Sequence, residues 1–343
     1  MPDPSAHVAI VGAGPIGIEI AVLLKRAGID YLHFDARQIG YTISWFAPQT
    51  RFFSSNDRIA IAGVPLQTAD QSKCTREQYL AYLRSVVLQF DLKINTYEPV
   101  VNIERAGWEF VLTTRRADGP RTYRVRKLVL ATGGTAKPRR LNVPGEDLPH
   151  VSHYFSDPHA FFQKDVLIVG GRNSAVEAAL RSHYCNARVA ISYRRAQFDA
   201  TAVKYWLLPE INALIQSGKI TGYFNTTVKE IRPGGAVLAR QDGPLIDVSA
   251  DFVLLLIGYE ADMTLCRLAG VQLKEPGHVP AFNPLTMETN VPGIYIAGTA
   301  IAGTQEKFAV FIENCHVHAE RILASLTGAK PPPVPDDTQR PES

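Results

Sequence analysis

The chain has 343 residues, which is longer than one hydrophobic core usually grows, so two domains are the first expectation. Hydrophobic residues make up 46% and charged residues 20%, an ordinary composition for a soluble globular protein. The 36 basic and 33 acidic side chains leave a net charge of only +3, which excludes a strongly basic nucleic-acid-binding surface. No apolar run approaches the roughly 18 residues of a membrane span. Residues 1–8 do not resemble a secretory signal, so we expect a cytoplasmic protein.

The cysteines indicate neither a disulfide scaffold nor a metal site. The four of them, Cys74, Cys185, Cys266 and Cys315, lie far apart and form no CxxC pair. Zinc sites and local redox pairs depend on such close spacing. We therefore expect no structural disulfide and no metal.

The chain opens with a strand, a glycine-rich turn and a helix. Residues 8–11 are apolar, and the apolar positions that follow Pro15 predict a helix that stops at Gly28. Residues 31–35 predict a second strand, which closes a right-handed βαβ unit.

The turn between them carries the pattern Gly12-x-Gly14-x-x-Gly17. Gly12 permits the tight bend, Gly14 lets a pyrophosphate approach the backbone, and Gly17 lets helix and strand pack closely. Asp35 ends the next strand and is placed to accept hydrogen bonds from an adenosine ribose. In this context the motif predicts a dinucleotide site rather than a structural turn.

Residues 40–70 are irregular and rich in aromatic side chains, which either stack on a flat ring or fill a small core within the loop. Thr75 and Gln78 have the spacing of a capping box at the start of a helix over 75–90. Strands are predicted next, at 92–103, 108–114 and 122–131. The last one leads into another glycine turn, Ala131-Thr132-Gly133-Gly134.

The opening pattern recurs from residue 165, with a strand at 166–169, a helix at 173–181 and a strand at 188–193. Its turn keeps Gly170 and Gly171 but has Arg172 in place of the second fingerprint glycine. Where an acidic residue usually follows the second strand, this chain has Arg194 and Arg195. Guanidinium groups bind a 2′-phosphate, so the pattern favours NADPH over NADH; the alternative is a pair of solvated surface arginines.

The remaining elements complete the two units. We expect a helix at 202–217, a strand at 252–258, a strand at 291–298 that ends in glycine, and a last helix at 308–326. Residues 330–343, rich in proline and polar residues, predict a disordered tail.

This order of parts resembles the two-dinucleotide flavoprotein superfamily and, within it, the low-molecular-weight thioredoxin reductase group. A closer resemblance is to the bacillithiol disulfide reductase-like family. It rests on QTRFFSSND, NVPGEDLPHVSHYF, GGRNSAVEAAL, METNVPGIYIAG and FIEN, which together extend over most of the chain.

The resemblance implies an α/β fold in which a Rossmann-like NADPH domain interrupts a Rossmann-like FAD domain. We expect the FAD domain at 1–150 and 284–329 and the NADPH domain at 151–283. The expected FAD contacts are Gly12, Gly14, Pro15, Ile16, Gly17, Asp35, Ala36, Val100, Ala131, Thr132, Gly133, Gly298, Thr299 and Phe308. The expected NADPH contacts are Gly170, Gly171, Arg172, Asn173, Ser174, Arg194, Arg195, Ile257 and Gly258.

Three positions depart from the resemblance. Thioredoxin reductases have CxxC where this chain has His153, which excludes reduction of thioredoxin by that route. The bacillithiol-type family has a cysteine beside the flavin where this chain has Ile16, and isoleucine cannot form a mixed disulfide. Thr299 replaces the usual aspartate that bonds the ribityl chain.

Cys315 and His153 are the catalytic candidates that remain. Cys315 starts a helix, which lowers the pKa of a thiol; the alternative is a buried structural cysteine. His153, like His316 and His318, is a candidate proton donor, although each is also a common structural histidine.

The resemblance to this family implies an enzyme that takes hydride from NADPH onto FAD and passes the electrons on to a low-molecular-weight disulfide such as bacillithiol disulfide. The alternatives are a cysteine-independent oxidoreductase that uses a quinone, oxygen or an electron-carrier protein, and a flavin-binding redox sensor with little turnover. A flavin monooxygenase is disfavoured because its FxGxxxH signature is not met around Gly145. The resemblance also implies a homodimer or a larger homo-oligomer.

Overall fold

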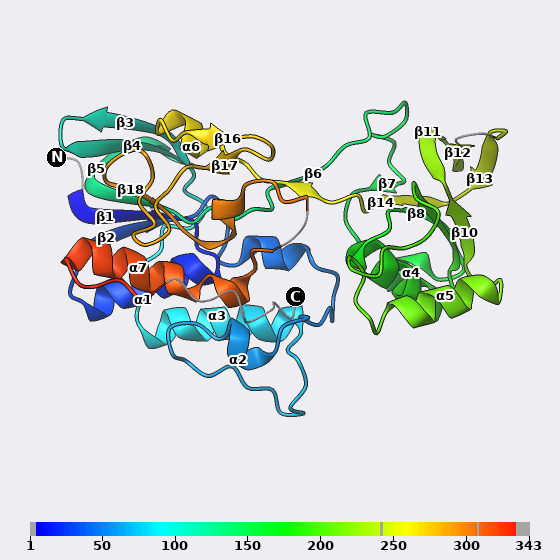
Figure 1. Ribbon diagram of the computed structural model, residues 1–343, viewed down its shortest axis with the longest axis horizontal. Helices are drawn as coiled ribbons and strands as arrows, with labels where there is room; N and C mark the ends of the chain where they lie inside the picture. The colour runs from blue at the N-terminus through cyan, green and yellow to red at the C-terminus, as the bar shows by residue number, and fades with distance from the viewer. Residues whose placement is uncertain (1–4, 241–242, 307–308, 334–343) are drawn as a thin grey trace. The chain divides into compact units, whose positions relative to one another are not determined.

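The computed structural model describes residues 5–240, 243–306 and 309–333 (Figure 1). The chain forms two compact units. The first unit contains residues 1–44, 49–137 and 260–343, and the inserted unit contains residues 45–48 and 138–259. The inserted unit therefore differs from the NADPH domain expected at 151–283. The chain crosses between the units within two short strands, β6 (Lys137–Pro138) and β15 (Tyr259–Glu260), which pair with each other.

In the described part of the first unit, six strands form one sheet in the order β2-β1-β5-β4-β3, with β18 also paired to β5. Strands β1, β2, β5 and β18 are parallel, whereas β3 and β4 form an antiparallel meander with β5. The bounds are β1 (Ser5–Val11), β2 (Tyr31–Phe34), β3 (Val100–Ala106), β4 (Glu109–Arg116), β5 (Gly119–Leu130) and β18 (Ile294–Ile296).

Alternation along β1 divides the core of this unit between the two faces of the sheet. Val8 and Ile10 pack with the helices α1, α3 and α7, while Ala9 and Val11 pack on the opposite face (Figure 1). The helices of the first unit are α1 (Pro15–Arg26), α2 (Asn56–Ile59), α3 (Arg76–Gln89), α6 (Thr264–Leu268) and α7 (His316–Thr327). Two short strands, β16 (Leu273–Lys274) and β17 (Val279–Pro280), form a separate ladder.

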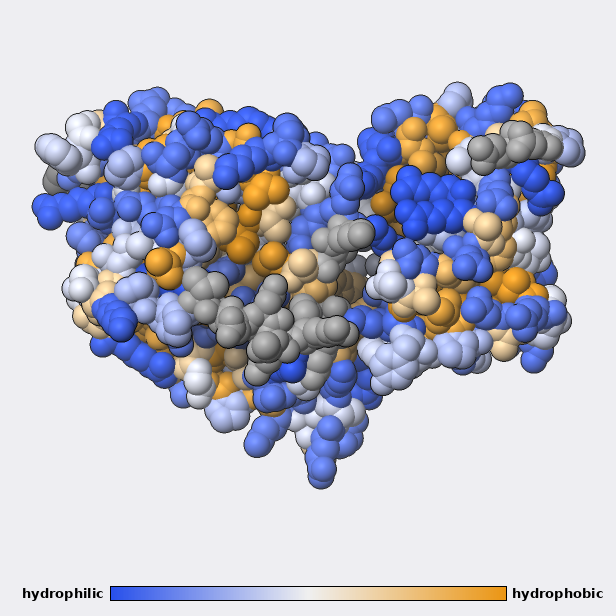
Figure 2. All heavy atoms as spheres, in the orientation of Figure 1, coloured by the Kyte–Doolittle hydropathy of each residue, from blue (hydrophilic) through white to orange (hydrophobic). Residues whose placement is uncertain are grey.

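In the described part of the inserted unit, five parallel strands have the order β10-β9-β8-β14-β7, and an antiparallel sheet β11-β12-β13 accompanies them. Helices α4 (Asn173–Tyr184) and α5 (Leu208–Gln216) belong to this unit. The strands are β7 (Val151–Ser152), β8 (Asp165–Val169), β9 (Arg188–Tyr193), β10 (Thr221–Phe224), β11 (Thr226–Arg232), β12 (Gly235–Arg240), β13 (Ile246–Ser249) and β14 (Phe252–Leu255). On the face shown in Figure 2, hydrophilic side chains cover most of each unit and apolar ones lie in scattered patches.

Three expected elements begin later than predicted, and each has a local cause. The expected strand at 92–103 begins at Val100, because Asn95 instead bridges the end of β2 through backbone bonds to His33 and Asp35. The expected helix at 202–217 begins at Leu208, with Pro209 in its first turn, where proline is tolerated.

The expected helix at 308–326 begins at His316, and Phe308 lies outside the described residues. The side chains of Gln305 and Asn314 bond the backbone of residues 309–311. These side-chain bonds replace the helical ones.

Candidate functional site

The glycine turn after β1 is shaped by close backbone contacts at two of its three glycines. At Gly12, which has φ +110°, an added Cβ would lie 2.3 Å from the carbonyl oxygen of Ala131. At Gly17, an added Cβ would lie 1.9 Å from the carbonyl oxygen of Gly12. Both positions therefore require glycine for the packing of α1 against the sheet.

Gly14 is different, because nothing in the protein requires a glycine there. It caps α1 with φ −75°, a conformation that any residue adopts, and an added Cβ would meet no atom within 4 Å. The space above Gly14 is therefore an open cradle at the amino end of a twelve-residue helix. A diphosphate fits such a cradle, because the helix amino terminus presents unpaired N–H groups and positive partial charge.

Asp35 lies immediately after β2 and helps to hold this turn. Its carboxylate accepts hydrogen bonds from the N–H groups of Ala13, at 2.6 Å, and Arg37, at 2.7 Å. Burial raises its pKa, and the two backbone N–H donors oppose that shift. Each carboxylate oxygen keeps a second lone pair, so the side chain can still accept bonds from ribose hydroxyls. Ala36 follows directly and is exposed.

His33 is a residue of this site that the sequence patterns did not indicate. It is fully buried in β2, and its Nε2 donates to the carbonyl oxygen of Gly12 at 3.0 Å. Burial lowers its pKa to about 4, so the imidazole is neutral at pH 7 and supports the turn as a donor. In the sequence, the only feature that could have indicated this role is a histidine within a short apolar strand.

Two further turns follow neighbouring parallel strands, β5 and β18, and are joined by a side chain. Ala131, Thr132 and Gly133 follow β5, and Gly298 and Thr299 follow β18. The Thr299 Oγ1 accepts a hydrogen bond from the N–H of Gly134 at 2.9 Å. The hydroxyl thus ties the two turns together and keeps its own proton available for a ligand.

Gly298 is held from the other side by α7. Its N–H donates to the Nδ1 of His318 at 3.2 Å, and an added Cβ at Gly298 would lie 3.5 Å from the Cβ of Ile16. Burial, with the nearby charges of Arg321 and His316, lowers the pKa of His318 to about 4. The neutral ring is therefore an acceptor at Nδ1, and Ile16 from α1 packs beside the same turn.

Val100 begins β3, an edge strand, and is buried. It lies two residues after Glu98, whose N–H donates to the carbonyl oxygen of Asp35 at 2.9 Å. The structure thereby brings Val100 close to the turn that holds Asp35. It does not place Phe308, which is among the residues outside the described ranges.

The second glycine turn, after β8, is tighter and lacks an open glycine. An added Cβ at Gly170 would lie 2.4 Å from the carbonyl oxygen of Leu256, and one at Gly171 would lie 2.3 Å from the Tyr193 ring. Arg172 caps α4 with φ −114°, and its side chain is exposed. Arg172 thus caps α4 with a charged side chain, whereas Gly14 caps α1 with no side chain.

The other residues expected to bind NADPH follow the carboxyl ends of parallel strands in the sheet that contains β8. Open α/β sheets bind ligands at these ends of their strands. Arg194 and Arg195 follow β9 and are exposed, and Arg195 pairs with Asp199 at 3.3 Å. Ile257 and Gly258 follow β14, and Gly258 has φ +98°. Asn173 and Ser174 begin α4.

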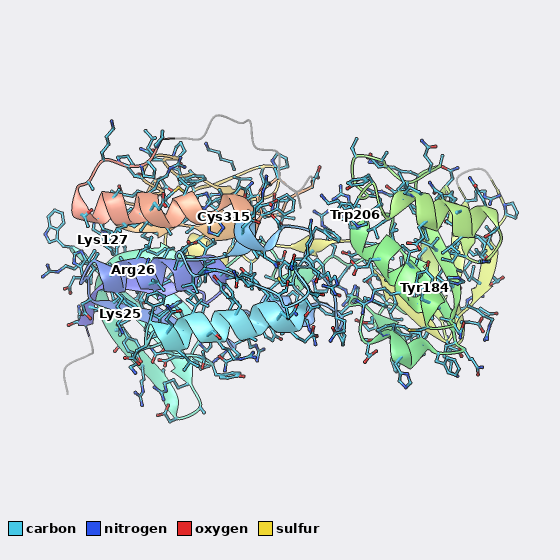
Figure 3. All side chains as sticks on the ribbon, turned by 90° about the horizontal axis from the view of Figure 1, so that it is seen from below. Lys25, Arg26, Lys127, Tyr184, Trp206 and Cys315 are labelled. Carbon is cyan, nitrogen blue, oxygen red and sulfur yellow. The ribbon has the colours of Figure 1, made fainter. Side chains whose placement is uncertain are left out.

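Of the two alternatives for Cys315, a reactive helix-start thiol and a buried structural cysteine, the structure agrees with the second. The residue precedes α7 (Figure 3), its side chain is fully buried, and burial raises the pKa of the thiol. Desolvation outweighs the helix terminus here, because a thiolate would lose its water without gaining a cationic partner. Burial likewise raises the pKa of Cys74 to about 11 and that of Cys266 to about 12. Cys185 ends α4 in the inserted unit.

The three candidate histidines have different surroundings. His153 lies in the inserted unit, with its Nε2 3.6 Å from the Oε1 of buried Glu146.

His316 lies in the first unit. It pairs through Nδ1 with Glu19 at 2.8 Å and through Nε2 with the carbonyl oxygen of Arg58 at 2.8 Å. Glu19 raises the pKa of His316 against the opposing effect of burial. His318 is neutral and engaged with Gly298, so it is a structural group at this turn.

Within residues 5–240, 243–306 and 309–333, no helix is both long and apolar enough to cross a bilayer. The same residues contain no group of three or more histidine, cysteine or acidic side chains arranged to hold a metal ion.

Comparison with known proteins agrees with this arrangement. The chain is 36% identical over 318 residues to the bacilliredoxin reductase Bdr of Bacillus subtilis, covering 92% of this chain and 96% of the relative. The structure of the bacillithiol disulfide reductase Bdr of Staphylococcus aureus is similar with a TM-score of 0.88 and 34% identity, over 95% of this chain and 99% of that one. The corresponding Bacillus cereus structure gives a TM-score of 0.89 and 35% identity, over 94% and 99%.

A family model also matches the chain, over residues 9–298, and describes a pyridine nucleotide-disulphide oxidoreductase. This range includes both glycine turns and the strand that leads to Gly298. The match confirms the expected two-dinucleotide α/β fold, the oxidoreductase class, and FAD and NADPH as its cofactors. The chain belongs to the pyridine nucleotide-disulphide oxidoreductase family.

Proposed function

We propose that the chain takes hydride from NADPH through FAD and delivers the two electrons to a low-molecular-weight disulfide. The observation that carries this proposal is the pair of glycine turns, one in each unit, with chemically different surroundings. The first has an open cradle at Gly14 and an acidic residue at the ribose position, and the second has arginines at both places. An enzyme with two distinct nucleotide sites can pass electrons from one bound nucleotide to the other.

The first unit holds FAD in this proposal. Gly12, Gly14, Pro15, Ile16 and Gly17 form the diphosphate turn, and Asp35 with Ala36 receives the adenosine ribose. Ala131, Thr132 and Gly133, together with Gly298 and Thr299, line the flavin side. The Thr299 hydroxyl accepts a hydrogen bond from the N–H of Gly134, so its own proton would be available to the bound cofactor. Val100 and Phe308 complete the expected set.

The inserted unit holds NADPH. Gly170, Gly171, Arg172, Asn173 and Ser174 receive the diphosphate at the amino end of α4, and Ile257 and Gly258 border it. Arg194 and Arg195 bind the 2′-phosphate. A charge-assisted bond contributes about 1.5–3 kcal/mol, so loss of one arginine contact would weaken NADPH by one to two orders of magnitude relative to NADH.

The protein supplies orientation, charge and proton transfer, while the bound flavin supplies the redox chemistry. Reduction of a disulfide to two thiols by NADPH consumes one proton in addition to the hydride. The His316–Glu19 pair holds a proton in the first unit, because Nε2 must donate to the carbonyl oxygen of Arg58 and Nδ1 faces a carboxylate. We assign proton storage to this pair.

The disulfide is proposed because the similar proteins are named for bacillithiol disulfide and bacilliredoxin. Bacillithiol disulfide is therefore the first substrate to test. Cys315 is not assigned a role in the reaction, because its thiol is buried and its pKa is raised. His153 remains the candidate acid near the segment where thioredoxin reductases carry their redox cysteines.

A second candidate function is reduction of a quinone, oxygen or an electron-carrier protein without any protein thiol. Ile16 favours it, because this buried side chain occupies the position of the cysteine that relatives have beside the flavin. In the described part of the chain, three of the four cysteines are buried. For either function we propose a cytoplasmic homodimer or larger homo-oligomer, and light scattering would measure its oligomeric state.

The function is tested by anaerobic titration of the FAD-loaded protein with NADPH and then with oxidised acceptors. Bleaching of the flavin by NADPH and its reoxidation by bacillithiol disulfide supports the disulfide reductase. Reoxidation by quinone or a carrier protein alone selects the second candidate. A flavin that NADPH leaves oxidised would remove both.

A further inference from the structure

The segment 195–207, between β9 and α5, is folded by hydrogen bonds to one acidic residue, Asp199. Asp199 Oδ1 accepts hydrogen bonds from the N–H and hydroxyl of Thr201, and its Oδ2 lies 3.3 Å from the guanidinium of Arg195. The backbone carbonyl of Asp199 accepts from the N–H groups of residues 202 and 203. Phe198 and Val203 are buried and anchor the segment in the core.

The far end of this segment lies against the second glycine turn. The N–H of Lys204 donates to the Oδ1 of Asn173 at 2.8 Å, and Asn173 is the first residue of α4. The segment therefore runs from the two arginines after β9 to the amino terminus of α4. These are the two places where the phosphate groups of NADPH are expected.

Lys204 is oriented by an aromatic neighbour. Its ammonium lies 5.9 Å from the centroid of the Trp206 ring, a cation–π distance, and Trp206 packs edge-on against Tyr205 at 4.9 Å. Trp206 is labelled in Figure 3. Tyr205 is 80% exposed and Trp206 40%. The Trp206 ring therefore covers one side of the ammonium, and Tyr205 supports that ring.

We propose that Lys204 binds the diphosphate of NADPH, and that Asn173 positions it by holding the backbone of the 195–207 segment. The inference rests on the proposed nucleotide site of the inserted unit. It explains how a turn without the second fingerprint glycine binds a diphosphate. Arg172 blocks the close backbone approach at that position, and two cations, Arg172 and Lys204, replace it with charge.

Lys204 and the arginines then read different parts of the same nucleotide. The diphosphate is common to NADPH and NADH, whereas the 2′-phosphate belongs to NADPH alone. Lys204→Gln should therefore weaken the binding of both nucleotides by the same factor, about one to two orders of magnitude for one charge-assisted bond. Arg194→Gln should weaken NADPH and leave NADH unchanged.

The experiment measures binding of NADP⁺ and NAD⁺ by calorimetry, and the KM for NADPH and NADH in flavin reduction, on the FAD-loaded protein. Lys219→Gln is the matched control. Lys219 is exposed and precedes β10, so it lies at the amino ends of the parallel strands, whereas the proposed nucleotide site lies at their carboxyl ends. Asn173→Ala and the double variant Asn173→Ala/Lys204→Gln test the positioning. If Asn173 acts through Lys204, the two losses will not add.

An equal loss for both nucleotides in Lys204→Gln, with the Lys219→Gln protein unchanged, supports the proposal. A Lys204→Gln protein that binds both nucleotides as the parent does would overturn it. A loss confined to NADPH would also overturn it, because it would place Lys204 at the 2′-phosphate. If the parent itself bound neither nucleotide, the proposed function would fail instead.

Discussion

Gly14 and Gly17 occupy the same turn but are glycines for different reasons. An alanine at Gly17 would place its Cβ 1.9 Å from a backbone oxygen, whereas one at Gly14 meets nothing within 4 Å. A backbone contact within the protein therefore requires glycine at position 17, and we propose that the diphosphate of FAD requires it at position 14.

This difference gives a paired prediction. Gly14→Ala should keep the unfolding midpoint of the cofactor-free protein and lose FAD affinity at least tenfold, because the methyl group occupies the cradle. Gly17→Ala should lower both. Thermal unfolding with and without FAD, and flavin content by absorbance, check the pair. A Gly14→Ala protein with parental FAD content would contradict the assignment of FAD to this turn.

His33 and His318 make the stability of the first unit depend on pH. The pKa of each falls to about 4 in the folded protein, from an unfolded value of 6.5. Between these values the unfolded chain binds more protons, so stability present above pH 6.5 is lost as the pH falls to about 4. The slope is about 1.4 kcal/mol per pH unit for each histidine.

His33→Gln should retain a donor to Gly12 and remove one of these protons. Urea unfolding of the parent and the variant between pH 4 and 6.5 gives the difference in slope. Other titrating groups cancel in that difference. Identical slopes for the two proteins would contradict the neutral, buried state of His33.

At the scale of elements, the helices and strands whose ends depend on nearby residues were predicted most accurately from the sequence. The helix α3 was predicted within a residue at each end, because Thr75 and Gln78 form the capping box that their spacing indicates. The strand β9 was predicted at its observed bounds, 188–193, because apolar residues predominate in it and Arg194 and Arg195 follow it.

The expected helix at 202–217 failed in its first half for a reason that the sequence does not display. Its backbone is bonded to Asp199 and Asn173, and these partners come together only in the folded unit. The same holds for residues 309–311, where side chains of Gln305 and Asn314 take the backbone bonds. The glycine turns were predictable because glycine motifs are local, whereas His33 and His318 depend on tertiary contacts.

The capping box offers a test at this scale. Thr75→Ala removes the acceptor of the Gln78 N–H, a bond of 3.3 Å, and should lower the free energy of unfolding by about 1 kcal/mol. Thr75→Ser keeps the oxygen and should retain most of the stability. Denaturant midpoints measure both; equal losses in the two variants would show that the hydroxyl is not what stabilises α3.

At the scale of the whole molecule, we propose that each of the two units binds one of the two nucleotides, and that residues near the flavin side of the first unit decide the acceptor. Residue 16 is an isoleucine, which cannot form a mixed disulfide, and Cys315, which precedes a neighbouring helix, is buried. We therefore propose that electron delivery does not depend on a thiol at either position.

We expect turnover to survive the loss of the thiol at Cys315. Cys315→Ala should keep NADPH oxidation with the preferred acceptor within about twofold, after correction for flavin content. Brief alkylation of the folded parent should likewise leave activity unchanged, because burial raises the pKa of three of the four thiols. Activity lost on alkylation and protected by the acceptor would contradict the prediction.

Transfer of hydride from NADPH to FAD is tested by rapid mixing of the FAD-loaded protein with NADPH, and separately with NADH, without oxygen. We expect NADPH to bleach the flavin at low concentration and NADH to need a concentration at least tenfold higher. We also expect bacillithiol disulfide then to restore the oxidised spectrum and to yield two thiols per NADPH. A flavin that stays oxidised with NADPH, or that is reduced equally well by both nucleotides, would contradict this expectation.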